Sequence, residues 1–285
     1  MRLLRKSSFL AAAFLALGGS VFADSPEERK PLELEQVGVT EHLNQKVDLN
    51  LTFIAEDGYP HALKEYFHAG RPVLLNLVYY TCKMLCNVVL NAQVQSLRKL
   101  DWTPGDQYEI VTISFDPTEN FQLAREKKAA YLESFGRPAP GWHFLSDNSD
   151  NARKLAVQVG FGYKFDEQTG QFAHPAVVFI LSPEGRVCRY LYGVQFKPMD
   201  IRLGLTEAAK EQFGVTDRIL LFCYHYDPAA KGYVPFAENF MRIGGALTVL
   251  ILGFVLYGLW RRERAAAARI RPMVTAKSVS YTHLL

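Results

Sequence analysis

Cysteine is scarce in this chain: 285 residues contain four, at Cys82, Cys86, Cys188 and Cys223. Two of them are close together and two are scattered, so they do not form the regular framework of a small disulfide-stabilised protein. Four cysteines permit three complete pairings, and the spacing does not choose among them. Cys188 lies within an apolar stretch and is interpreted as a small buried hydrophobic residue.

A strong excess of charge is also lacking, because 32 basic and 29 acidic residues leave a formal net charge of +3. No basic stripe with interleaved aromatic residues is present, which excludes nucleic acid as a partner. No internal repeat is visible either. With 49% hydrophobic residues, the chain has the composition of one sizeable domain with appendages at its ends.

Near the N-terminus, the apolar run Phe9–Leu17 lacks the length to span a bilayer. Three basic residues precede it, and a small-residue cleavage site ends at Ala23. This pattern predicts a secretory signal peptide over residues 1–23 and argues against an uncleaved anchor. Residues 24–45 are charged, contain proline and are predicted to be a linker.

A second apolar segment, Ile243–Trp260, contains no charged residue and predicts a transmembrane helix of near-minimal length. The basic cluster Arg261–Arg264 is denser than the single Arg242 at the other end. The positive-inside rule therefore places the tail 261–285 in the cytoplasm. Together with the signal peptide, this predicts a domain in the periplasm, held to a bacterial inner membrane.

The stretch 73–90, VLLNLVYYTCKMLCNVVL, carries the strongest chemical pattern. Its apolar run Val73–Tyr80 predicts a strand buried on both faces, and helical spacing of apolar residues follows. Cys82 and Cys86 are then predicted on the first turn of a helix and on one face, with Cβ atoms about 5–6 Å apart. The helix N-terminus and Lys83 are expected to favour thiolate.

Elsewhere, strand and helix patterns alternate and predict a three-layer α/β domain over residues 46–214. Residues 215–242 form a connecting segment rich in aromatic side chains. The predicted strands are Val47–Phe53, Tyr108–Phe115, Trp142–Leu145, Ala176–Leu181 and Val187–Tyr192. The predicted helices are Ala62–Phe67, Asn120–Phe135, a helix capped by Asp147 or Ser149 and ending near Val159, and one from the cap Asp200 to about Gln212.

A strand, a cysteine pair at a helix start and a later hairpin entered through His174-Pro175 resemble a thioredoxin-like fold with a mixed central sheet. The three-residue gap between the cysteines resembles the Sco/SenC family of copper-binding assembly factors for cytochrome c oxidase. The resemblance covers about residues 37–214, through LVYYTCKMLC, SFDP, GWHFL, QFAH, SPEG and RYLYG. CYHYDP resembles an element of the membrane-anchored branch.

The resemblance implies a metal site made of Cys82, Cys86 and His174. Many family members have proline where this chain has Lys83 and Asn87. Pro175 could occupy the place where thioredoxins keep a cis-proline, and the sequence leaves its isomer open.

Copper, as Cu(I) or Cu(II), suits these ligands, because Cu(I) prefers thiolate and accepts imidazole as a third ligand. A structural zinc site normally takes a fourth ligand, and none is evident. The two cysteines also lie close enough in sequence for a Cys82–Cys86 disulfide. Both states are expected to interconvert, with copper binding to the reduced one.

Other residues have two interpretations. Asp116 follows a predicted strand and would either orient a ligand or cap the next helix, the structural role being favoured. Cys223 and His225 share a face of an extended segment. They would form an accessory copper or docking site, or belong to an aromatic segment at the bilayer interface.

Two function classes follow. The first is a metallochaperone that passes copper to the copper-acceptor subunit of cytochrome c oxidase. The second is an enzyme, a thiol–disulfide oxidoreductase that keeps the acceptor's cysteines reduced. The cysteine spacing and His174 favour the first class.

Overall fold

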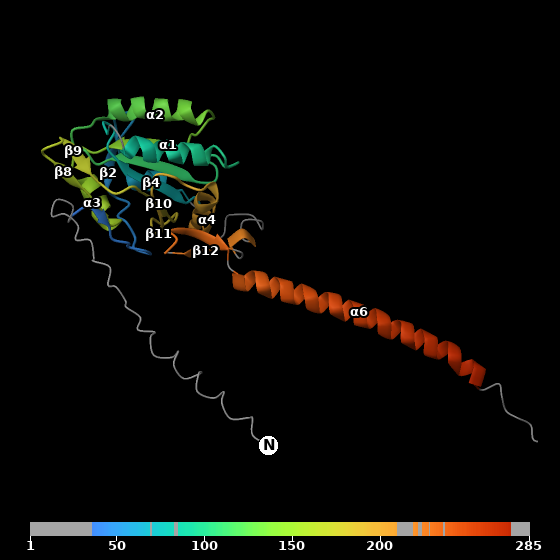
Figure 1. The fold of residues 1–285 in the computed structure, drawn as a ribbon. Coiled ribbons are helices and arrows are strands. Elements are labelled where there is room, and N and C mark those ends of the chain that lie inside the picture. Colours follow the sequence, from blue (N-terminus) through green and yellow to red (C-terminus); the bar gives the residue numbers. More distant parts are fainter. Residues whose placement is uncertain are drawn as a thin grey trace, which may run out of the picture.

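The computed structural model describes residues 36–68, 70–82, 85–209, 219–221, 224–227, 229–235 and 237–274. The predicted signal peptide, Lys83 and Cys223 therefore lie outside the described residues. An α/β body and one long helix, α6 (Ala237–Val274), make up the structure (Figure 1).

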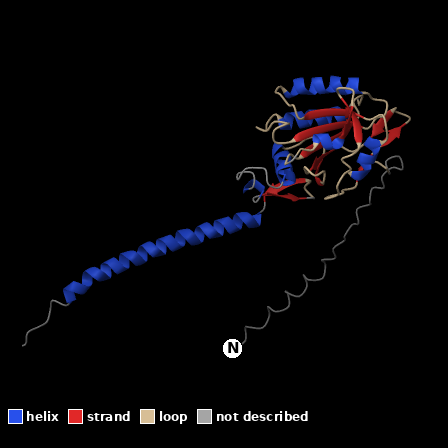
Figure 2. Ribbon diagram, turned by 180° about the vertical axis from the view of Figure 1, so that it is seen from behind, coloured by secondary structure: helices blue, strands red, loops and turns tan. Residues whose placement is uncertain are grey.

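A seven-stranded mixed sheet with the order β11-β10-β4-β5-β6-β2-β3 forms the centre of the body (Figure 2). Three neighbouring parallel strands lie in its middle: β4 (Val73–Val78), β5 (Glu109–Ser114) and β6 (Trp142–Ser146). Antiparallel strands flank them, with β10 (Val177–Leu181) and β11 (Val187–Tyr192) on one side and β2 (Thr52–Ala55) and β3 (Pro60–Ala62) on the other. The predicted mixed central sheet is confirmed.

Helices cover both faces of this sheet. The crossovers from β4 to β5 and from β5 to β6 place α1 (Leu85–Leu97) and α2 (Phe121–Phe135) together above the sheet in Figure 1. The helix α3 (Asn151–Gln158) lies below the sheet, and α4 (Pro198–Ala209) packs against β10 and β11. A short 3₁₀ helix, η2, spans Leu63–Tyr66.

The innermost strands are buried because both of their faces are covered. Every residue of β4, β5 and β10 is buried. Asn76 is the polar exception within β4, and its amide donates hydrogen bonds of 3.2 Å each to Gln93 and Thr112. These bonds offset part of the cost of burying its amide.

Two predicted boundaries are wrong. The strand predicted at Val47–Phe53 begins only at Thr52, because the Val47 amide donates to the Gly185 turn and not to a neighbouring strand. The alternation of apolar residues in this segment still predicts correctly which side chains are buried, since Val47 and Leu51 lie in the core. Asp200 does not cap a helix but lies in the first turn of α4, which begins with Pro198.

The strands of two or three residues, β3 among them, were not predicted, because so few residues do not show an alternating pattern. The strands β1 (Gly38–Val39) and β7 (Phe161–Gly162) pair with each other. The strands β8 (Lys164–Asp166) and β9 (Gln171–Ala173) form a hairpin that leads directly to His174.

The hairpin of β12 (Tyr224–Asp227) and β13 (Gly232–Pro235) connects the body to α6. Within α6, the segment Met241–Arg264 has 24 residues and a mean hydropathy of 2.0, so its length and composition suffice to cross a membrane. The helix continues through the basic cluster that the sequence analysis placed in the tail.

Candidate metal site

The two cysteines lie where the chain passes from β4 into α1, but they do not both lie in the helix. Cys86 is the second residue of α1, whereas Cys82 precedes the helix, so the predicted position of Cys82 is wrong. The Cys86 amide donates to Cys82 Sγ at 3.3 Å. The thiol of Cys82 thus takes the place of a capping oxygen for one of the unpaired amides at the helix start.

His174 reaches this pair from the loop before β10. That strand runs antiparallel to β4, so the start of β10 and the end of β4 meet at one edge of the sheet. His174 Nε2 lies 3.1 Å from Cys86 Sγ. The sulfur atoms of Cys82 and Cys86 and a ring nitrogen of His174 all lie within 4.8 Å of one another, and this is the one such group in the described part of the chain.

The ring of His174 is oriented for ligation. Its Nδ1 lies 3.0 Å from the Pro175 carbonyl oxygen, which can only accept a hydrogen bond. Nδ1 therefore carries the proton, and the lone pair of Nε2 faces the sulfur atoms. Metal-binding histidines commonly have this arrangement, with the second ring nitrogen donating to a backbone carbonyl. The His174–Pro175 peptide is trans.

Both thiols are withdrawn from solvent. Cys82 is 4% exposed and Cys86 is 2% exposed, and no disulfide joins them. The hydrogen bond with Cys82 and burial raise the pKa of the Cys86 thiol well above its ordinary value. For Cys86 in the metal-free protein, this contradicts the expected preference for thiolate, because burial and the neighbouring sulfur outweigh the helix N-terminus.

Aromatic side chains enclose His174. The rings of Tyr79, Phe115 and Phe161 have centroids 5.9, 5.7 and 6.0 Å from its imidazole centroid. Phe172 of β9 closes the cluster, with its ring 5.4 Å from both Tyr79 and Phe115. The sequence predicts that Tyr79, Tyr80 and Met84 pack against or shield the site; the ring of Tyr79 does so, and Met84 lies outside the described residues. The other rings were missed because they come from three separate segments.

Asn87, which stands where many family members have proline, supports the cysteine loop. Its amide nitrogen donates to the Cys82 carbonyl oxygen at 2.8 Å, and its amide oxygen accepts from Tyr131 at 3.3 Å. Tyr80, on the other side of the loop, donates from its hydroxyl to the Leu145 carbonyl at 2.7 Å. Both side chains therefore fix the loop from within the core.

The acidic residue that contacts the cysteine loop is Glu119, which the sequence analysis did not single out. It accepts hydrogen bonds from the Tyr80 and Thr81 amides. Asp116 accepts instead from Thr118, through the amide at 2.9 Å and the hydroxyl at 2.7 Å. Asn120, and not Asp116, caps α2. No sequence pattern distinguishes Glu119 from a surface glutamate at the start of a helix.

The remaining nominated residues do not join the site. Cys188 lies on β11 and is partly buried, and His225 lies on an exposed position of β12. Because Cys223 is outside the described residues, the accessory site stays a prediction. The ring nitrogens of His61 lie within 2.9 Å of the Asp57 and Glu65 carboxylates.

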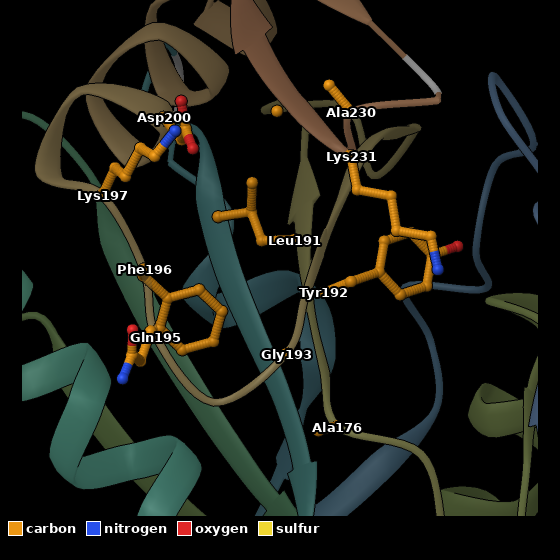
Figure 3. Close-up of a pocket in the computed structure, with 11 residues that line it drawn as sticks. Ala176, Leu191, Tyr192, Gly193, Gln195, Phe196, Lys197, Asp200, Ala230 and Lys231 are labelled. Atoms are coloured by element: carbon orange, nitrogen blue, oxygen red, sulfur yellow. The ribbon is translucent and has the colours of Figure 1, made fainter.

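A separate cavity of about 490 Å³ lies between the β11–α4 connection and the turn of the β12–β13 hairpin. Lys197, Asp200 and Lys231 are among its lining residues (Figure 3). None of the three metal-ligand candidates lines it. The metal site, with two buried thiols and a partly buried imidazole, is therefore separate from this cavity.

A thioredoxin-like α/β domain with two thiols and one imidazole at a sheet edge defines a class of metal-binding proteins. The model of the SCO1/SenC family matches residues 40–207, more than half of the chain, and the chain belongs to this family. The search of curated protein sequences found no match to this chain.

Several solved structures are similar to this chain. A candidate electron transfer protein of Aquifex aeolicus VF5 is 24% identical with a TM-score of 0.53, over 61% of this chain and 98% of its own. Copper-bound ScoI of Arabidopsis thaliana is 20% identical with a TM-score of 0.44, over 57% and 97%. BsSco, a member of the Sco family of cytochrome c oxidase assembly proteins, is 20% identical with a TM-score of 0.43, over 61% and 99%.

Proposed function

We propose that this chain is a copper metallochaperone that delivers copper to the copper-acceptor subunit of a respiratory cytochrome c oxidase. The observation that carries the proposal is the convergence of Cys82, Cys86 and His174, whose ligand atoms lie within 4.8 Å of one another. Thiolate is the preferred protein ligand of Cu(I), and imidazole also suits copper. Membership of the SCO1/SenC family supports the same metal.

The donor set fits copper better than zinc. A closed structural zinc site is almost always four-coordinate, and the described cluster offers three ligands. The burial of both thiols limits the access of solvent and oxidants to the sulfur atoms, which protects Cu(I) and the thiols from oxidation. In this proposal copper is the cargo, and the two cysteines and His174 hold it until an acceptor offers its own ligands.

The alternative function is a thiol–disulfide oxidoreductase acting through Cys82 and Cys86, since the two thiols are adjacent. Exchange begins when a thiolate attacks a disulfide sulfur, so the attacking sulfur must be accessible. Exposed fractions of 4% and 2% argue against fast exchange with a protein substrate. The burial of the thiols therefore favours the metallochaperone.

An anaerobic Cu(I) titration of the reduced, full-length protein in detergent tests the proposal. We expect one copper ion per chain, bound tightly enough to compete with a chromogenic Cu(I) chelator. The same preparation should reduce insulin slowly in the standard turbidity assay. Fast insulin reduction without stoichiometric copper binding would establish the oxidoreductase instead.

We further propose that α6 anchors the chain in a bacterial inner membrane, with the α/β body in the periplasm and the C-terminus in the cytoplasm. The span Met241–Arg264 has the required length and hydropathy. The basic residues Arg261, Arg262 and Arg264 cluster at its C-terminal end, the side that faces the cytoplasm under the positive-inside rule. The signal-peptide pattern of residues 1–23 supports export of the body.

Reporter fusions check this orientation. Alkaline phosphatase fused after residue 236 should be active, and the same enzyme fused after Arg264 should be inactive, because it folds only outside the cytoplasm. Protease added to spheroplasts should digest the α/β body of the unfused protein. An active fusion after Arg264, together with a protected body, would reverse the orientation.

A further inference from the structure

Glu119 is a buried acid that the proposed copper chemistry does not use directly. It lies between β5 and α2 and is 6% exposed. One carboxylate oxygen accepts from the Tyr80 amide at 2.6 Å and from the Ser114 hydroxyl at 2.5 Å. The other oxygen accepts from the Thr81 amide at 2.6 Å.

These three donors explain how the carboxylate is tolerated in the interior. A buried carboxylate is costly unless hydrogen bonds replace its water, and bonds to a charged acceptor are short and strong. The described part of the chain contains no ion pair to Glu119. Removing the carboxylate would leave two backbone amides of the cysteine loop without their acceptor, which is costly at Tyr80 because this residue is buried.

The two amides belong to the residues directly before Cys82, so Glu119 ties the β5–α2 connection to the loop that carries the first thiol. From the other side, the Asn87 amide holds the Cys82 carbonyl oxygen at 2.8 Å. The position of Cys82 Sγ relative to Cys86 and His174 therefore depends on these two tethers. Asn87 belongs to α1, the helix that follows the loop, whereas Glu119 comes from the connection between β5 and α2.

We propose that Glu119 is a positioning residue of the metal site, which holds the Tyr80–Thr81 backbone so that Cys82 Sγ meets the other two ligands. This inference rests on the proposed copper function. Side chains that orient metal ligands typically change metal affinity by about 10–100-fold when they are replaced. Glu119 acts through hydrogen bonds to the loop and does not touch the ion.

Glu119→Gln is the informative variant, because the amide has nearly the same size but only one accepting oxygen. Its NH2 group cannot accept the loop amide that the second carboxylate oxygen now binds. We expect the Kd for Cu(I) of the full-length protein to rise by about 10–100-fold. The matched control is Glu126→Gln, which removes one negative charge from an exposed position of α2 and should leave the Kd unchanged.

Two further readouts separate positioning from a general loss of stability. In the metal-free protein, the Tyr80 and Thr81 amides should exchange with deuterium faster in Glu119→Gln than in Glu126→Gln, while exchange across β5 stays the same. In the copper-loaded protein, the Cu(I) X-ray absorption edge of Glu119→Gln should shift part of the way toward the form of two-coordinate Cu(I), because Cys82 meets the ion in a smaller fraction of the molecules.

Glu119→Asp keeps the carboxylate, but its side chain is shorter by one methylene, so the carboxylate lies farther from the loop amides. Its Kd for Cu(I) should lie between those of the native protein and Glu119→Gln. If the native protein binds copper and both Glu119 variants bind it with the native Kd, the positioning role is refuted. If native protein binds no copper, the proposed function fails. In that case unchanged amide exchange in Glu119→Gln would refute the tether as well.

Discussion

Replacing Cys82 or Cys86 by serine is expected to abolish tight Cu(I) binding, with Kd higher by about 1,000-fold or more, equivalent to about 4 kcal/mol. Serine keeps the size of the side chain but exchanges a soft sulfur for a hard hydroxyl oxygen, which Cu(I) binds poorly. Only two ligands would then remain in a cluster that offers three within 4.8 Å. Competition with a chromogenic Cu(I) chelator measures the loss.

Cys188→Ser is the matched control, because Cys188 lies on β11 outside the cluster. Its Kd for Cu(I) should equal that of the native protein. Full affinity in Cys82→Ser would mean that copper binds elsewhere in the chain. Equal losses in Cys82→Ser and Cys188→Ser would point to a change in folding and not in ligation.

The second large effect is expected for His174→Ala. Loss of the imidazole should raise the Kd for Cu(I) by about 100-fold, equivalent to about 2.7 kcal/mol, because one of three ligands disappears while both thiols stay. Thiol exchange requires only the attacking and leaving sulfur atoms, so the rate at which Cys82 and Cys86 are reduced or oxidised should change little. The same variant therefore separates the two candidate functions.

In cells, His174→Ala should lower the copper content of cytochrome c oxidase, and added copper should restore part of it by mass action. His61→Ala is the control, since His61 is held by Asp57 and Glu65 away from the cluster. Normal copper binding by His174→Ala, with oxidase assembly failing only in the cysteine variants, would replace the metallochaperone by the oxidoreductase.

Local patterns account for what the sequence predicted well. The buried strand before Cys82 and the amphipathic helix after it depend on residues that are neighbours in the chain, and so does the hairpin of β10 and β11. Apolar runs and helical spacing reveal such elements directly. The cysteine pair was visible for the same reason, although its assignment to one helical turn missed that Cys82 stands before the helix and accepts the Cys86 amide.

The nomination of His174 depended on a family resemblance, and its meeting with Cys86 depends on the sheet. The two residues are 88 positions apart, and only the antiparallel pairing of β10 with β4 brings them together. The aromatic enclosure has the same origin, since Phe115, Phe161 and Phe172 come from separate segments.

The sequence by itself determined the long central strands, the main helices, the thiol pair and the apolar C-terminal segment, because each follows from local spacing and composition. The tertiary structure decided which acid supports the site. Asp116 and Glu119 are three residues apart and both carry a carboxyl group, yet only Glu119 is turned inward to the Tyr80 and Thr81 amides. It also decided the direction in which the Cys86 pKa departs from its ordinary value, because the hydrogen bond with Cys82 and burial raise this pKa. Both outcomes depend on packing between distant segments, which local patterns do not encode.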